Sequence, residues 1–382
     1  RKIVKEIELV AKRKAREKHF LQPDGTIVAK LYDTDIHYLK DGKYEEIDNT
    51  LIEDGDFYTN KSNDYKIYFS KKSSDSLMNL KKENHYLNIQ LKQAKETKMS
   101  KKKSISKLIE EVSYDNIYDG IDIEYKTLPE KVKETIVLHH NQVDNMTFMV
   151  DTDLTLELEK GYIIAKEGDN LIFTIEKPYM EDANGVRNDN IYYELIEDND
   201  KYGIKLILDK EWLASENTKY PIYIDPTILV PNTEKGVYDT YIYPGDTDVD
   251  RNSRDILKVG VEEVSGQYVT NRTLIKFDLP ELGTSSEIIE ATLWLIGYPT
   301  SPSQAAAVFD KTLAVHRVTT NWNETTANWN NMSENYDKDR IESVVIVNNN
   351  WIEEDGTATA RYSYAYLTGL VKQWYTGTPN KF

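Results

Sequence analysis

The segment TTNWNETTANWNN, from Thr319 to Asn331, holds residue types that could bind or cleave a sugar. Trp322 and Trp329 offer flat aromatic rings for stacking on pyranose rings, and Glu324 is a carboxylate set between them. Cleavage of a glycosidic bond needs two carboxyl groups roughly 5–10 Å apart across a cleft. The acids of this chain mostly alternate along expected strands, which is typical of solvent-facing side chains, so the sequence favours binding over cleavage.

The same segment could instead anchor a loop to a hydrophobic core. In one straight strand, two side chains seven residues apart point to opposite faces, so Trp322 and Trp329 share a platform only if the chain bends between them. The Asn- and Thr-rich spacer favours such a bend. We expect both indoles to be buried at the rim of a β-sandwich, with Glu324 accepting hydrogen bonds from backbone N–H groups of the bend.

Further aromatic residues could form a sugar-binding platform together with Trp322 and Trp329. Trp351 follows a predicted strand and precedes two glutamates, which favours exposure of its ring. Tyr298 ends another predicted strand and is also a candidate. Trp294 lies inside the alternating stretch ATLWLIG, where large aromatic side chains are usually buried, so we expect it in the core.

One loop has the spacing of a calcium site. In GDTDVDRNSRD, Asp246, Asp248 and Asp250 occupy alternate positions, from which hard oxygen ligands can converge on a cation. The loop is not an EF-hand, because Arg251 stands where that motif needs Gly and Leu257 where it needs Glu. An ordinary polar loop is the alternative. We expect no cofactor apart from a structural calcium that this loop could hold.

Composition excludes several classes of protein. The formal net charge of −17 argues against a nucleic-acid partner. The absence of cysteine excludes disulfides, thiolate nucleophiles and cysteine zinc sites. No apolar run approaches the roughly 18 residues that a membrane span needs. Because no phosphate-binding loop, Gly-x-Ser-x-Gly or His-Glu-x-x-His motif occurs, we predict that the chain is not an enzyme.

The hydrophobic pattern is mostly that of strands. Tyrosine is abundant, at 27 of 382 residues, which favours strands over helices. Apolar and polar residues alternate over many short stretches separated by turn signals. These predicted strands are Gly25–Tyr32, Asp64–Ser70, His85–Lys92, Ile121–Leu128, Leu154–Glu159, Tyr162–Lys166, Tyr202–Leu208, Val237–Pro244, Ile256–Val261, Arg272–Leu279, Glu290–Tyr298, Leu313–Val318 and Glu342–Val347. A few helical turns are expected near Lys2–Arg16 and Leu367–Tyr375. The predicted fold is all-β, with tandem antiparallel β-sandwiches.

A boundary between domains is expected near Pro226. The stretch YPIYIDPTILVPN, Tyr220–Asn232, resembles a last strand followed by an extended connector marked by prolines. The Lys-rich residues 92–107 could form a second seam. The predicted parts are a basic amino-terminal segment at 1–19, a β region at 20–228 that a seam near 92–110 would divide into two modules, a linker at 229–236 and a second β region at 237–382.

The second β region resembles a known family. From Val237 onward the stretches YDTYIYPGDTD, ILKVG, NRTLIKFDLPEL and IIEATLWLIGY occur in this order, followed by VTTNWNETTANWNN and LTGLVKQWYTGTPN. With these markers the region resembles the DNRLRE domain, a family that overlaps with one class of carbohydrate-binding modules. The resemblance implies a β-sandwich of jelly-roll type, in which the motif around Trp322 and Trp329 recurs as a signature of the fold.

The region departs from the DNRLRE pattern in two ways. Members of the family usually carry Asp in a Phe-Asp-Ile-Thr stretch, and Tyr366 stands at that position here, which puts calcium in doubt. Members also continue past the Thr-Pro-Asn stretch with strands that close the sandwich, whereas this sequence stops at Phe382. The resemblance therefore implies a domain truncated at its carboxy-terminal end, or one that another chain completes by adding strands.

The first β region resembles the amino-terminal part of Rhs/YD-repeat wall-associated proteins, which are large exported bacterial surface proteins. Four stretches carry the resemblance in the same order, namely DGTIVAKLYDTDIHYLKDGKYEEIDNTL, YDNIYDGIDIEYKTLPEKVKETIVL, FTIEKPYMEDANG and DKEWLASENTKYPIYIDPTI. In that family a long Rhs shell and a toxin often follow. The resemblance implies an extracellular or cell-surface location.

Several functions remain open from the sequence. The leading prediction is a non-enzymatic, exported structural or adhesive module at the front of a larger Rhs-type protein, whose partner is the cell wall or the downstream shell. The alternatives are a carbohydrate-binding module for cell-wall or extracellular polysaccharide, a subunit of a self-assembling fibre or sheath, and an enzyme that acts on polysaccharide.

Overall fold

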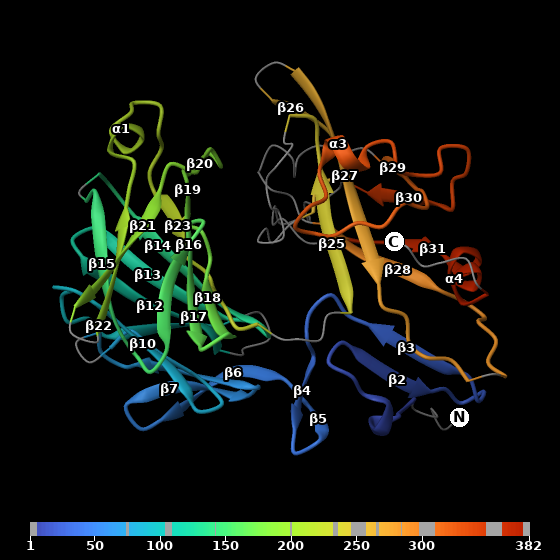
Figure 1. Ribbon diagram of the computed structural model, residues 1–382, viewed down its shortest axis with the longest axis horizontal. Helices are drawn as coiled ribbons and strands as arrows, with labels where there is room; N and C mark the ends of the chain where they lie inside the picture. The colour runs from blue at the N-terminus through green and yellow to red at the C-terminus, as the bar shows by residue number, and fades with distance from the viewer. Residues whose placement is uncertain are drawn as a thin grey trace. The chain divides into compact units, whose positions relative to one another are not determined.

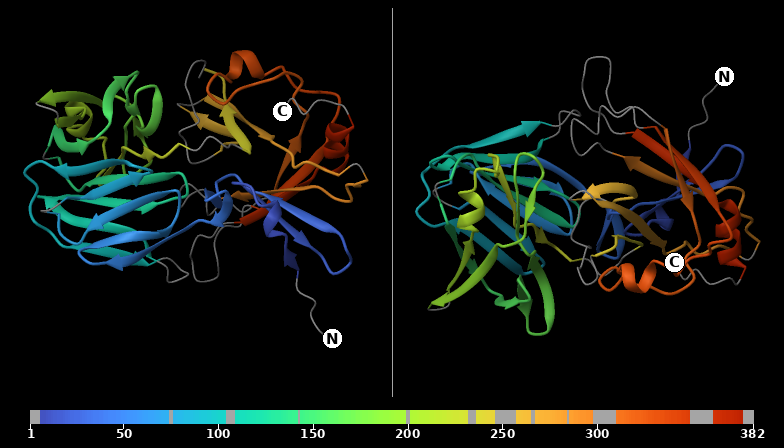
Figure 2. Two further views of the ribbon diagram at one scale, coloured as in Figure 1. Left: turned by 60° about the horizontal axis from the view of Figure 1, so that its bottom comes forward. Right: turned by 90° about the horizontal axis from the view of Figure 1, so that it is seen from above.

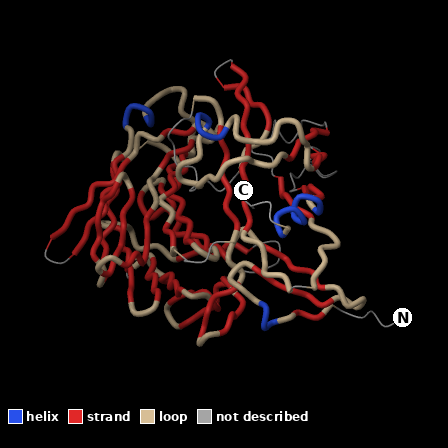
Figure 3. Tube along the Cα trace, turned by 45° about the vertical axis from the view of Figure 1, so that its right-hand side comes forward, coloured by secondary structure: helices blue, strands red, loops and turns tan. Residues whose placement is uncertain are grey.

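The structure is a computed structural model that describes residues 6–73, 76–103, 109–141, 143–198, 201–231, 236–245, 257–264, 267–283, 285–297, 310–348 and 361–376. Antiparallel strands dominate these residues and the helices are short, which confirms the all-β prediction (Figure 3). The chain divides into two compact units, Arg1–Lys235 and Gly236–Phe382. Within the described residues, no helix combines the length and apolar character that a bilayer crossing requires.

The first unit is built mainly from two large antiparallel sheets (Figures 1 and 2). In spatial order, one sheet consists of β21 (Tyr192–Asp198), β22 (Lys201–Ile207), β15 (Asn145–Thr152), β10 (His85–Leu91), β9 (Met78–Lys82), β8 (Tyr65–Ser70), β7 (Phe57–Ser62) and β6 (Asp48–Asp54). The other consists of β11 (Met99–Lys103), β12 (Ile109–Tyr118), β13 (Ile121–Thr127), β14 (Lys131–Leu138), β24 (Ile228–Leu229), β18 (Asn170–Ile175), β17 (Tyr162–Glu167) and β16 (Thr155–Glu159), with β19 (Tyr179–Glu181), β20 (Arg187–Asn188) and β23 (Ile222–Asp225) beside this path.

The two sheets enclose one hydrophobic core, because strand residues alternate between the core and solvent. In β8, Ile67 and Phe69 are fully buried whereas Tyr68 between them faces outward. In β13, Ile123 and Tyr125 take the buried positions from the opposite sheet, and the Phe69 and Tyr125 rings lie 5.3 Å apart. A short helix, α1 (Lys210–Leu213), closes the connection after β22.

A smaller amino-terminal part belongs to the same unit. It holds a sheet of β1 (Ile7–Glu8), β2 (Glu17–Leu21) and β3 (Ile27–Leu31), a 3₁₀ turn at Val10–Lys12, and the hairpin of β4 (His37–Lys40) and β5 (Lys43–Glu46). The few helical turns expected near Lys2–Arg16 are confirmed only in part, because the described residues there form one 3₁₀ turn, Val10–Lys12, and β1. Arg16 is buried and forms ion pairs with Asp35 at 2.8 Å and with Glu130 at 2.5 Å. These pairs hold the segment against residues that lie far from it in the sequence.

The second unit holds three smaller antiparallel sheets among its described residues. They are β25 (Val237–Ile242), β27 (Gln267–Phe277) and β26 (Gly260–Val264), then β28 (Thr292–Gly297) with β31 (Arg361–Tyr366), and β29 (Asp310–Val315) with β30 (Ser343–Asn348). Two short helices accompany them, α3 (Trp329–Met332) and α4 (Thr368–Tyr375), and α4 confirms the helix predicted at Leu367–Tyr375. The jelly-roll topology stays a prediction.

A buried acid makes the stability of the first unit depend on pH. Glu134 of β14 is buried, and the Tyr125 hydroxyl donates a hydrogen bond to its carboxyl group at 2.6 Å. Burial raises the pKa of Glu134 to about 7, and the nearby Asp225 carboxylate acts in the same direction. In the unfolded chain the same group ionises near its ordinary pKa, so folding binds a proton between about pH 4.5 and 7.

We predict that Glu134→Gln flattens this pH dependence. The raised pKa stabilises the fold below about pH 4.5, and this contribution is lost as pH rises to about 7. Glutamine keeps the acceptor for Tyr125 without the buried charge, so the variant should be more stable at pH 8 by up to about 3 kcal/mol. Chemical denaturation of both proteins from pH 4.5 to 8 measures the difference. Parallel pH profiles would contradict the prediction.

Candidate functional site

An exposed row of aromatic side chains covers one face of the β28–β31 pair. Leu293 and Ala365 point to the other face and pack in a small hydrophobic cluster of the second unit. The alternation then directs Trp294 outward, where 64% of its surface is exposed. The prediction that Trp294 is a core residue is therefore wrong. The register of the strand decides the face, and the large size of the indole does not override it.

The aromatic rings lie next to one another across the two strands. Trp294 and Tyr364 are direct partners in the antiparallel ladder, and their ring centroids are 5.7 Å apart at an angle of 46°. Tyr366, two residues along the same strand, contacts Tyr364 edge to face at 5.3 Å. Tyr364 and Tyr366 are 47% and 58% exposed. We call Trp294, Tyr364 and Tyr366 the aromatic face.

Hydrogen-bonding groups border the aromatic face. Thr292 is the ladder partner of Tyr366, and its hydroxyl donates to the Glu290 carboxylate at 2.9 Å. The neighbouring Tyr364 hydroxyl raises the pKa of Tyr366, and Glu290 adds to the effect. The phenol of Tyr366 therefore stays protonated at neutral pH and can donate, while Glu290 can accept. Flat rings beside such groups can bind a ligand that has apolar faces and hydroxyl edges.

Trp322 and Trp329 do not form a second exposed platform. Only 8% of Trp322 is exposed, and its indole packs with Ile242 and Leu274 in another hydrophobic cluster. Trp329 is half-buried against that cluster, and the Arg272 guanidinium lies 5.0 Å from its ring. The burial of Trp322 suits an anchor and leaves little of its ring free for a sugar.

The chain bends between these two tryptophans, as predicted. The Asn323 side chain accepts a hydrogen bond from the Thr325 N–H at 2.8 Å and starts a turn. Asn328 then caps α3, and Asn331 bonds back to it in a reciprocal capping box. Glu324 accepts a bond from the backbone N–H of Asp239 in β25 at 2.8 Å, a donor outside the bend that was expected to supply it. The carboxylate thus links the bend to the first strand of the unit.

Several predicted site residues lie outside the described part of the chain. These are Tyr298 and Trp351 among the candidate sugar platforms, and the proposed calcium ligands Asp246, Asp248 and Asp250.

One cluster elsewhere has the residue types of a metal site. Glu8, His37 and Glu46 bring one ligand atom each to within 4.8 Å of one another. However, the Arg13 guanidinium bonds Glu8 at 2.6 Å and Glu46 at 3.1 Å, so both carboxylates already share a cation. Burial lowers the pKa of His37, which accords with a neutral ring bonded to the Lys14 carbonyl at 2.8 Å. The geometry is that of a structural ion-pair cluster.

Sequence reasoning missed the two tyrosines of the aromatic face. The stretch RYSYAY places Tyr362, Tyr364 and Tyr366 at alternate positions with Ser363 and Ala365 between them. In a strand this pattern puts all three rings on one face and small side chains on the other. This alternation of small and large residues in the sequence could have predicted the aromatic face, because small side chains fit on the packed face of a strand and large ones then remain in solvent.

Comparison with known proteins assigns the second unit to a family. Residues 232–370 match the model of carbohydrate-binding module family 96. This family 96 module includes the aromatic face, the bend and both buried clusters of the second unit. The match covers less than half of the chain.

The relatives are wall-associated proteins. The chain is 28% identical over 260 residues to the tRNA nuclease WapA of Bacillus subtilis, a match that covers 63% of this chain and 11% of that protein. It is 32% identical over 142 residues to the tRNA3(Ser)-specific nuclease WapA of Bacillus spizizenii, covering 34% of this chain and 6% of that protein. A wall-associated protein of Geobacillus stearothermophilus is 24% identical over 207 residues, which cover 46% of this chain and 75% of that protein. The chain is a distant homologue of these proteins and spans about a tenth or less of the two Bacillus relatives.

We predict that Trp322→Ala destabilises the family 96 module. Truncating a buried indole leaves a cavity in its cluster, which costs about 3–5 kcal/mol. Trp294→Ala is the matched control, since an exposed indole in the same module should change stability by only about 0.5 kcal/mol. Thermal and chemical unfolding of the three proteins gives the comparison. An unchanged melting temperature for Trp322→Ala, together with lost glycan retention, would reverse its assigned role.

Proposed function

We propose that this chain is a non-enzymatic, polysaccharide-binding part of a longer bacterial surface protein, and that the aromatic face makes the contact. The observation that carries the proposal is the pairing of exposed Trp294 with exposed Tyr364 on the solvent face of β28–β31. Membership of residues 232–370 in a carbohydrate-binding module family supports the ligand class.

Large aromatic rings are costly to expose to water. Leaving an indole in water forgoes about 2 kcal/mol of burial, and adjacent exposed rings form an apolar patch of the kind that marks binding sites. A pyranose ring has an apolar face of C–H groups that can cover such a patch. Its hydroxyl edge then meets the phenols, Thr292 and Glu290 around it. A two-stranded face is open rather than enclosed, which suits a polymer better than a small molecule.

Polysaccharide binding and adhesion, two of the functions that the sequence left open, would here be one function. Binding of wall polysaccharide would make the chain an adhesive module, and its wall-associated relatives support a location at the cell wall or surface. One oxygen of the Glu324 carboxylate accepts a hydrogen bond from the Asp239 N–H, a contact that suits an anchoring side chain and so supports a non-enzymatic role. The nuclease activity that the names of the Bacillus relatives state is a property of those proteins, and we do not propose it for this chain.

We predict that Trp294→Ala and Tyr364→Ala each weaken retention of the chain on insoluble Gram-positive cell wall or on another insoluble polysaccharide. Loss of one stacking ring should weaken binding about tenfold. Tyr268→Ala is the control, because Tyr268 is 80% exposed in the same unit but lies on β27. Co-sedimentation with the insoluble material measures the bound fraction.

The same variants separate polysaccharide binding from self-assembly. If Trp294→Ala retained full binding to every polysaccharide, the aromatic face would not be the contact. If the substitution instead converted a concentration-dependent oligomer into a monomer by light scattering, the face would be an interface between copies and the fibre hypothesis would replace the proposal.

A further inference from the structure

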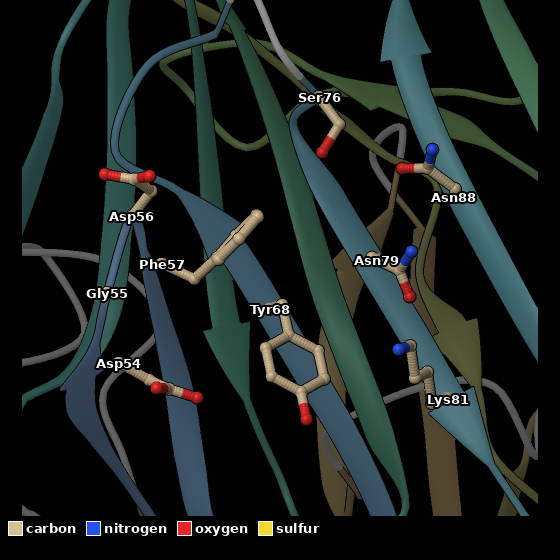
Figure 4. A pocket seen from close by; sticks show the side chains of 9 residues that line it. All are labelled: Asp54, Gly55, Asp56, Phe57, Tyr68, Ser76, Asn79, Lys81 and Asn88. Carbon is tan, nitrogen blue, oxygen red and sulfur yellow. The ribbon is translucent and has the colours of Figure 1, made fainter.

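An open groove lies on the first unit, on the solvent face of the sheet that contains β6 to β10. It has a volume of about 550 Å³ and is lined by Asp54, Gly55, Asp56, Phe57, Tyr68, Ser76, Asn79, Lys81 and Asn88. Figure 4 shows the rings of Phe57 and Tyr68 side by side, with Asp54 and Asp56 on one flank and the two asparagines with Lys81 on the other. The Phe57 and Tyr68 rings meet edge to face with centroids 6.1 Å apart.

A row of polar side chains runs across the sheet, and three of its members, Tyr68, Asn79 and Asn88, line the groove. Thr59, Tyr68, Asn79 and Asn88 are successive ladder partners on β7, β8, β9 and β10, so they share one face of the sheet. The side-chain oxygens of Thr59, Asn79 and Asn88 are shielded and have no hydrogen-bond partner among the described residues. Each such group costs about 1–3 kcal/mol unless a bound molecule or water satisfies it. Two of these oxygens, on Asn79 and Asn88, belong to residues that line the groove and mark a place where a ligand would complete the hydrogen bonding.

The charged groups at the groove differ from other charges nearby in their lack of ion pairs among the described residues. Nearby cations on the same sheet have ion-pair partners, as in Lys71 with Glu53 and Lys82 with Asp64. By contrast, the side chains of Asp54, Asp56 and Lys81 form no ion pair among the described residues. The Lys81 ammonium lies 5.2 Å from the Tyr68 ring centroid, at the edge of the groove.

The arrangement selects a ligand that is neutral and rich in hydroxyl groups. The carboxylates can only accept hydrogen bonds and the ammonium can only donate them, while the two amides can do both. A cation would meet Lys81, and an anion would meet Asp54 and Asp56. Vicinal hydroxyls accept and donate at neighbouring positions, and the C–H face of a sugar ring fits against Tyr68 and Phe57.

We propose that this groove is a binding site for a neutral oligosaccharide, separate from the aromatic face of the family 96 module. Tyr68 and Phe57 supply the apolar wall, Asn79 and Asn88 hydrogen-bond the hydroxyls from the floor, and Asp54, Asp56 and Lys81 close the rim. The chain then holds two sugar sites, one on each unit.

Isothermal titration calorimetry of the full chain tests this site with three probes: chitotetraose, cellotetraose and maltotetraose. The titrations start from the double variant Trp294→Ala/Tyr364→Ala, so that the groove is measured without the aromatic face. At least one tetrasaccharide should bind. Adding Tyr68→Ala should weaken that binding about tenfold or more, whereas adding Tyr192→Ala, which removes a tyrosine 50% exposed on β21, should leave it unchanged.

Asn79→Leu separates binding from folding. It removes an unpartnered oxygen and keeps similar volume, so the melting temperature should hold or rise while affinity falls about tenfold. The proposal is overturned if no tetrasaccharide binds the double variant, or if Tyr68→Ala and Asn79→Leu both leave the affinity unchanged. Failure of the aromatic face has a different signature, because the unmodified chain and the double variant would then bind insoluble polysaccharide equally well.

Discussion

The alternation of side chains between the two faces of a β-strand is the constraint on which both units depend. In β8 it buries Ile67 and Phe69 and directs Tyr68 to solvent, and in β28 it packs partly buried Leu293 against a cluster and directs Trp294 to solvent. The residues that hold the sheets together thus fix which side chains are presented outside. Strands form most of each candidate site, although Gly55, Asp56 and Ser76 of the groove lie outside strands. Each is the outer face of strands whose inner face is committed to a core.

The strand pattern could be predicted from the sequence because alternation is local. Stretches such as Asp64–Ser70 and Glu290–Tyr298 gave β8 and β28 within a few residues. Of the helical turns expected near Lys2–Arg16 only one 3₁₀ turn is present, and Arg13 and Arg16 beside it pair with Glu46 and Glu130, which lie far along the sequence. The size of the Trp294 side chain predicts burial, but the register of β28 places the indole in solvent. The groove needed the register between four strands, which no single stretch of sequence contains.

Electrostatics separates the groups that stabilise the fold from those free to bind. Arg16 and Arg13 lie in ion pairs that fasten the amino-terminal strands, and the carboxylate of Glu324 fastens a loop to β25. Each of these contacts commits a charged side chain to holding parts of the chain together. The groove differs, since among the described residues the side-chain oxygens of Asn79 and Asn88 are shielded and lack a hydrogen-bond partner. An absent partner is therefore a better guide to a binding site here than the presence of carboxylates, which are abundant throughout.

Two open sugar sites on one chain would act differently from one deep pocket. An open aromatic face excludes little water and buries little of its ligand, so each site alone should bind weakly. A wall polysaccharide repeats the same units along its length, and once one site is bound the other meets the polymer at a high effective concentration. Retention can then exceed the affinity of either site by about 10²–10⁴ without any new contact. Weak, open and repeated contacts therefore suit a protein part whose task is to remain on a polymer surface.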